Sequence, residues 1–239
     1  MGRVNIIEKG LAKKAQLDTV MPGERITVTP DILMLSGDSI LSIIEEFYEL
    51  GYGIVHCATS TFIIQDSFNI SEEIALFSAK HGVNLLKQNV GFITEQDPLT
   101  DKIITGIERR EIGEFGAFGS IALHVSPATM AKCLGTGKIE LTVPETIYIE
   151  MNGLLSGNQK VEGICAYLND YFNDSLVGYG IILGGESLNH LDDEAKRRLT
   201  TFLYELGGAI GMISPSGPLG QVESAVKIKT HQITDRNRV

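Results

Sequence analysis

A chain of 239 residues, 43% of them hydrophobic, can bury a core in one large domain or two small ones. Its 30 acidic residues outnumber its 20 basic ones, and the formal net charge of −10 argues against nucleic acid or an anionic membrane surface as a partner. No apolar run approaches the roughly 20 residues that span a bilayer, and the first residues lack a signal-peptide core, so we expect a cytoplasmic protein.

The three cysteines lie far apart in the chain and form no Cys-x-x-Cys pair. This pattern favours small buried side chains over a disulfide framework, because free cysteine is among the most buried residue types. Thiolate metal sites draw three or four ligands, at least two of them close in sequence. We therefore predict no metal and no iron–sulfur cluster bound by this chain alone.

The first half of the chain alternates between short apolar runs and helical spacing. Residues 26–28 are predicted as a strand, and the apolar face of residues 39–50 predicts a helix. Residues 54–55 are predicted as a buried strand. A second helix is expected from Ser71, with spacing that continues to Leu85, and residues 102–105 are predicted as a short strand.

The second half continues the alternation. A glycine-rich stretch over 113–119 precedes a predicted helix of small residues over 126–134, and the period of two in 146–151 predicts a half-exposed strand. Helices around 161–168 and after Asp192 accompany the buried strands 179–183 and 210–213.

This order of elements predicts an α/β fold of mostly parallel sheets flanked by helices. We expect one domain over residues 1–214, with a subdomain boundary near residue 138, where half-exposed strand character begins. Residues 215–239 are expected to form a polar, solvated tail.

Local motifs alone name no reaction. Gly116 and Gly119 have the spacing of a Gly-x-x-Gly loop, but no Lys-Ser/Thr follows, as a phosphate loop requires. Arg109 and Arg110 suit a bidentate clamp for a carboxylate, or else form a solvated surface pair bridged to neighbouring glutamates. The five histidines are dispersed and show no metal-ligand spacing.

Taken together, several segments resemble the large subunit of isopropylmalate dehydratase and homoaconitase, in the aconitase superfamily. The resemblance runs from about residue 5 to 216 and implies an aconitase-like fold. The segments that carry it are residues 7–12, 17–18, 21–24, 31–34, 37–39, 116–119, 134–137, 143–146, 184–187 and 207–213.

The resemblance implies dehydration and rehydration of a hydroxy-acid, for which the family uses a [4Fe–4S] cluster, Asp–His pairs, a serine base and arginines. Glu108 stands where the family has an aspartate, but the nearby histidine is missing. The family's cluster cysteines lie in a later half of its chain, beyond the segments that this sequence resembles, so we do not expect them here. The resemblance and local motifs together give these ligand-binding candidates: Asp38, Ser39, Thr59, Ser60, Glu108, Arg109, Arg110, Gly116 and Gly119.

Three functions stay open at this point. The first is a non-catalytic binding, regulatory or structural module that recognises a small hydroxy-polycarboxylate. The second is a hydro-lyase subunit that needs a separate chain for the iron–sulfur half. The third is a metal-independent lyase that uses Asp38, Glu108 and Arg110. We lean against an autonomous hydro-lyase, and expect either a homo-oligomer or a separate protein subunit as partner.

Overall fold

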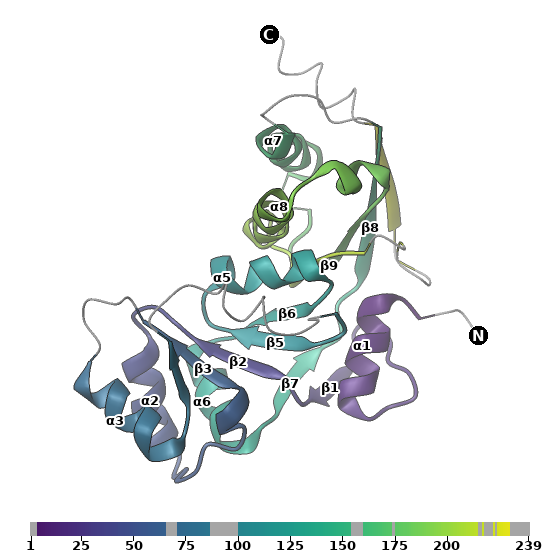
Figure 1. Ribbon diagram of the computed structural model, residues 1–239. Helices are drawn as coiled ribbons and strands as arrows, with labels where there is room; N and C mark the ends of the chain where they lie inside the picture. The colour runs from purple at the N-terminus through teal and green to yellow at the C-terminus, as the bar shows by residue number, and fades with distance from the viewer. Residues whose placement is uncertain are drawn as a thin grey trace.

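The computed structural model describes residues 4–65, 71–86, 100–153, 160–173, 175–214, 217, 222 and 224–229. These residues form two parallel sheets, one in each half of the chain, with helices between and around them (Figure 1). The α/β fold with parallel sheets predicted from the sequence is confirmed. Within the described ranges, no helix is long and apolar enough to cross a membrane.

The first sheet has five parallel strands in the order β4-β3-β2-β5-β6. Helices cover both faces, as parallel sheets require. One face packs on α2, α3 and α6, and the other on α5, η2 and α8. The strands are β2 (Ile32–Leu35), β3 (Thr61–Ile64), β4 (Asn84–Leu86), β5 (Ile103–Gly106) and β6 (Ile121–His124).

The second sheet has four parallel strands in the order β10-β9-β8-β11. Its apolar side chains pack against α7 and α8 in a separate core cluster. The strands are β8 (Thr146–Asn152), β9 (Gly180–Gly184), β10 (Ile210–Ile213) and β11 (Ser224–Lys229).

A short antiparallel ribbon pairs β1 (Arg25–Val28) with β7 (Ile139–Thr142). The subdomain boundary expected near residue 138 falls just before β7, and the second sheet begins with β8. The helices are α1 (Ile6–Ala15), α2 (Ile40–Glu49), η1 (Ala58–Ser60), α3 (Glu72–His81), α5 (Arg109–Gly113), η2 (Glu114–Phe118), α6 (Pro127–Thr136), α7 (Lys160–Phe172), η3 (Glu186–His190) and α8 (Asp193–Glu205).

Local sequence signals set several helix starts. Asn5 and Glu8 form a reciprocal capping box at the start of α1, with two hydrogen bonds of 3.0 Å. The Ser126 hydroxyl caps α6 ahead of a proline, and the Asp192 carboxylate accepts from the Ala195 backbone at 2.8 Å to cap α8. The predicted helices and the strands at 26–28, 102–105, 146–151, 179–183 and 210–213 are confirmed within a few residues.

The strand predicted at residues 54–55 is wrong. Ile54 is 79% exposed, and its segment is a connection anchored where the His56 backbone N–H donates to the Leu134 carbonyl at 2.8 Å. The helix from Ser71 ends at His81, so that Leu85 lies in β4 instead. Strands β2, β3 and β6 are missing from the predicted elements, because short apolar runs lack a distinctive period.

The solvated tail expected over 215–239 is wrong for residues 224–229. These residues form β11, which pairs in parallel with β8 along its whole length. Ile228 is buried, and the Lys227 ammonium lies 3.2 Å from the Glu150 carboxylate. One buried apolar side chain and a complementary charge therefore add this segment to the sheet. Residues 230–239 lie outside the described residues.

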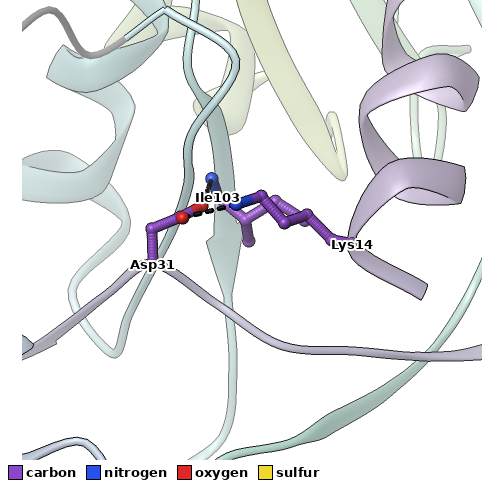
Figure 2. A network of polar contacts seen from close by, with 3 residues as sticks. All are labelled: Lys14, Asp31 and Ile103. Atoms are coloured by element: carbon purple, nitrogen blue, oxygen red, sulfur yellow. Dashed lines mark hydrogen bonds and ion pairs between the residues drawn. The ribbon is translucent and has the colours of Figure 1, made fainter. Parts of the chain in front are cut away.

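A polar network holds α1 against the first sheet. The Lys14 ammonium lies 2.5 Å from one oxygen of Asp31, and the other oxygen accepts a hydrogen bond from the Ile103 backbone at 2.8 Å (Figure 2). Both charged side chains are about three-quarters buried, which reduces screening by water. Lys14 therefore neutralises a carboxylate that joins the starts of β2 and β5.

We expect Lys14→Met to lower the free energy of unfolding by about 1–2 kcal/mol, because it leaves a partly buried carboxylate without its charge partner. Urea unfolding measures this. The control is Arg198→Met, since Arg198 pairs with Glu162 at 2.6 Å while both side chains are half exposed. That exposed pair is screened by water, so its loss should lower stability much less than the loss of the Lys14 pair. Equal losses in the two variants would contradict the role given to Lys14.

The two sheets meet through α5, η2 and α8. Figure 1 shows α5 between the sheet that contains β5 and β6 and the helix α8. The Tyr204 hydroxyl on α8 donates to the Ala122 carbonyl of β6 at 2.7 Å. This bond is buried, and burial also raises the pKa of Tyr204. Helix α8, from the second half of the chain, thus packs over one face of the first sheet.

Candidate functional site

The first sheet contains a topological switch point. From β2 the chain proceeds outward to β3 and β4, then returns to the other side of β2 with β5 and β6. In open parallel sheets of this kind, ligands bind at the carboxyl ends of the strands where the direction reverses. Here that place lies between the residues that follow β2 and those that follow β5.

The loops after β2 and β5 are in direct contact. Gly37 has φ +74°, and a Cβ atom built there would lie 2.6 Å from Oε1 of Glu108. A glycine at this turn therefore leaves room for the Glu108 carboxylate. Asp38 and Ser39 follow Gly37; Asp38 is exposed, and Ser39 stands at the start of α2 without a side-chain capping bond.

A pocket of about 420 Å³ opens beside these loops. Three kinds of element line it: the turn after β5 into α5, the end of β6, and one face of α8. The lining residues are Ile107, Glu108, Arg109, Arg110, His124, Thr201, Tyr204 and Glu205. Three predicted site residues, Glu108, Arg109 and Arg110, thus line one pocket, with Asp38 and Ser39 on the neighbouring loop.

Arg109 and Arg110 are exposed at the pocket. Within the part of the chain that the structure describes, neither guanidinium has a carboxylate within 4 Å. The bridge to neighbouring glutamates considered for these arginines is therefore absent from the described residues. The Thr201 hydroxyl donates to the Arg110 carbonyl at 3.3 Å, which links the start of α5 to α8.

His124 is a pocket residue that sequence reasoning missed. It ends β6 opposite Gly106 of β5, which places it beside the turn that contains Glu108 and Arg109. Partial burial and the Arg109 guanidinium lower the pKa of His124, opposed by a hydrogen bond to the Ile107 backbone and by the Glu108 carboxylate. A signal existed in the sequence, because polar residues that end buried parallel strands gather at one sheet edge.

A second pocket, also about 420 Å³, adjoins the first and shares Arg110, Thr201 and Glu205 with it. In this pocket Arg198 pairs with Glu162, and the Arg197 guanidinium lies over the Phe118 ring, 5.1 Å from its centre. Burial raises the pKa of Glu114 in its wall, and Arg197 opposes this shift.

Thr59 and Ser60 do not belong to this site. They form the end of η1 and precede β3, whereas the pocket lies beyond the carboxyl ends of β5 and β6. Because β3 runs parallel to β2, the two residues lie at the opposite edge of the sheet. The Ser60 hydroxyl instead bonds within its own turn, to the Cys57 carbonyl at 3.4 Å.

Gly116 and Gly119 serve the junction of the two sheets and do not line the pocket. A Cβ atom at Gly116 would lie 2.0 Å from the Gly211 carbonyl oxygen of β10. Gly119 ends η2 with φ +78°, and its backbone N–H donates to the Gly116 carbonyl at 3.2 Å. The sequence motif suggested that both glycines contact the ligand. In the structure, Gly116 allows η2 to approach β10, and Gly119 ends η2.

The three thiols do not converge. Cys57 precedes η1, Cys133 is buried in α6, and Cys165 lies in α7 against the second sheet. Burial raises the pKa of Cys57, and those of Cys133 and Cys165 to about 12, so all three are protonated at neutral pH. Among the described residues, no group of three or more His, Cys, Asp or Glu has a metal-binding arrangement.

No protein-family model matches the chain. The 3-isopropylmalate dehydratase large subunit of Halothermothrix orenii is 23% identical, over 89% of this chain and 54% of that protein. Large subunit 1 of the same enzyme from Pyrococcus furiosus is 25% identical over 90% and 54%. A probable methanogen homoaconitase large subunit from Methanothermobacter thermautotrophicus is 23% identical over 90% and 55%. The chain thus spans about half the length of these curated relatives.

Proposed function

We propose that this chain, a relative of the isopropylmalate dehydratase and homoaconitase large subunits with an aconitase-like α/β fold, binds a small hydroxy-polycarboxylate in the pocket between β5, β6 and α8. It acts as a binding or regulatory module. The observation that carries the proposal is that Arg109, Arg110, Glu108 and His124 line one pocket at the switch point.

The charges of the pocket suit a hydroxy-acid. Arginine binds carboxylates through two parallel hydrogen bonds, and Arg109 and Arg110 have no competing carboxylate within 4 Å among the described residues. The carboxylates of Glu108 and Glu205 can accept a hydrogen bond from a hydroxyl of the ligand, while its carboxylates bind the two arginines. A ligand with carboxylate at the arginines and hydroxyl at the glutamates satisfies both sets.

The described residues do not fit an iron–sulfur cluster. A cluster needs several thiolates within reach of one centre, but Cys57 and Cys133 lie near each other while Cys165 lies in the core of the second sheet. Burial raises the pKa of Cys133 and Cys165 to about 12, so both thiols stay protonated at neutral pH. We therefore propose that this part of the chain works without a cluster, and we assign no step to one.

A second candidate is a metal-independent lyase. His124 beside Glu108 favours it, because a pair of titratable groups in one pocket has the composition of a general acid and base. One group would take a proton from carbon while the other protonates the departing hydroxyl, giving water and an unsaturated acid.

A separate subunit or a second copy of the chain remains our proposal for the partner, since the relatives are named large subunits.

The binding test uses isothermal titration calorimetry with malate, citrate and 3-isopropylmalate. We expect at least one of these acids to bind, and Arg110→Gln to weaken that binding about tenfold, because it removes a charge-assisted pair of hydrogen bonds. Arg109→Gln should act in the same direction.

Arg25→Gln is the matched control, because Arg25 is an exposed arginine of β1 that does not line the pocket. It should bind like the wild type. Absence of binding for all three acids, or equal affinity in Arg25→Gln and Arg110→Gln, contradicts the proposal. Absorbance can follow conversion of the bound acid to an unsaturated product. If that conversion occurs and is lost in His124→Gln, the protein is a lyase and the binding-module proposal is wrong.

A further inference from the structure

We propose that His124 takes up a proton when a carboxylate enters the pocket, so that binding at this site tightens as the pH falls. The inference rests on the proposed function and adds its regulation. Its basis is the position of a single imidazole at the end of β6, in the wall shared with Arg109 and Arg110.

The surroundings of His124 come from three elements. The turn after β5 brings Glu108, Arg109 and Arg110, and α8 brings Glu205 and the Tyr204 phenol. The Tyr204 hydroxyl is occupied by the Ala122 carbonyl and stays protonated, so it adds no charge. Arg109 and Glu108 act on the ring directly, and Arg110 and Glu205 line the same pocket. The arginines are the groups that a ligand carboxylate would neutralise.

The free pocket disfavours a charged imidazole. Partial burial and Arg109 lower the pKa of His124 from its ordinary value of 6.5, so the ring is mostly neutral at pH 7. A carboxylate bound to Arg109 cancels part of that repulsion and adds an opposite charge beside the ring. Both changes raise the pKa of His124 in the complex.

The direction of the pH dependence follows from linkage. The complex holds more protons than the free protein wherever the pH lies near or between the two pKa values of His124, so affinity rises as pH falls through that range. At a pH above the pKa of His124 in both the free protein and the complex, affinity does not change with pH. Malate carboxyl groups are largely ionised between pH 6 and pH 8 and contribute little over that interval. Because a single ionisable group is involved, we expect at most about tenfold tighter binding at the lower pH.

The test is calorimetry with malate at pH 6, 7 and 8, each in two buffers of different ionisation enthalpy. We expect affinity roughly three- to tenfold higher at pH 6 than at pH 8, with uptake of a fraction of a proton at pH 7. His124→Gln should flatten the profile and abolish the uptake. His190→Gln is the matched control, because His190 is an exposed histidine in η3 that lies outside the pocket, and it should keep the wild-type slope.

The outcomes separate the two proposals. No binding of malate or the other acids at any pH overturns the proposed function, and this inference with it. Binding without proton uptake, or an unchanged slope in His124→Gln, overturns only the role of His124. If that variant does not fold, an NMR titration of the His124 ring in the wild type replaces it. Its pKa must then rise when malate is added; an unchanged value contradicts the inference.

Discussion

Replacing Gly116 with alanine is expected to destabilise the protein by about 3 kcal/mol or more. The added Cβ atom would lie 2.0 Å from the Gly211 carbonyl oxygen and 3.3 Å from Cα of Met212. All of these neighbours belong to the backbone of a central part of the fold, so relief requires η2 and β10 to move apart. No side-chain rotation can supply that space.

The same displacement would disturb the pocket, because α8 packs on both η2 and α5. A Cβ atom at Gly113 would lie 2.7 Å from Cα of Thr201, which shows how closely α5 approaches α8.

Urea unfolding followed by circular dichroism measures the loss of stability in Gly116→Ala. Gly53→Ala is the control: nothing lies within 4 Å of its added atom, and its φ is not positive. That variant should change stability by less than about 1 kcal/mol. Similar values for the two variants would show that η2 and β10 are not in tight contact.

Gly37→Ala is expected to act on stability and on binding together. Its φ of +74° costs an alanine about 1–2 kcal/mol. In addition, the new methyl group would lie 2.6 Å from Oε1 of Glu108. The end of a flexible side chain can move away with little loss of stability, so this contact mainly displaces the carboxylate from the pocket. We expect malate-type acids to bind about fivefold more weakly, the equivalent of one lost hydrogen bond.

Gly51→Ala separates backbone strain from the Glu108 contact. Gly51 has φ +79°, close to that of Gly37, but nothing lies within 4 Å of its added Cβ. Both variants should lose about 1–2 kcal/mol, and only Gly37→Ala should lose affinity. In a Glu108→Ala background, Gly37→Ala should cause no further loss of binding. Weaker binding in Gly51→Ala, or an additive loss in the double variant, would contradict a direct effect through Glu108.

Much of the secondary structure could be predicted because its causes are local. The apolar stripe of α2, the Asp192 cap of α8 and the buried run of β9 depend on residues within one or two turns of each other. The grouping of Glu108, Arg109 and Arg110 was also accessible, since the three are consecutive and follow strand β5. The resemblance to aconitase-like large subunits likewise depends on residue order alone.

The edge of the sheet at which a residue lies is not local. Thr59 and Ser60 were assigned to the site by their order in the chain, but order does not say whether a residue precedes or follows its strand. The structure places them before β3 and therefore at the far edge. Likewise, β11 forms because it pairs with β8, a strand distant in sequence. The polar composition of residues 224–229 does not indicate that pairing.

The sequence by itself determined an acidic α/β chain without a thiolate cluster motif, with arginines after a buried strand that suit a carboxylate. Only the tertiary structure brought His124 to Glu108, because adjacent parallel strands β5 and β6 align their carboxyl ends. It also showed why residue 116 is a glycine, since the Gly211 carbonyl lies against it across the interface between the two sheets. Contacts between distant segments leave no periodic trace in a single sequence, and the site depends on them.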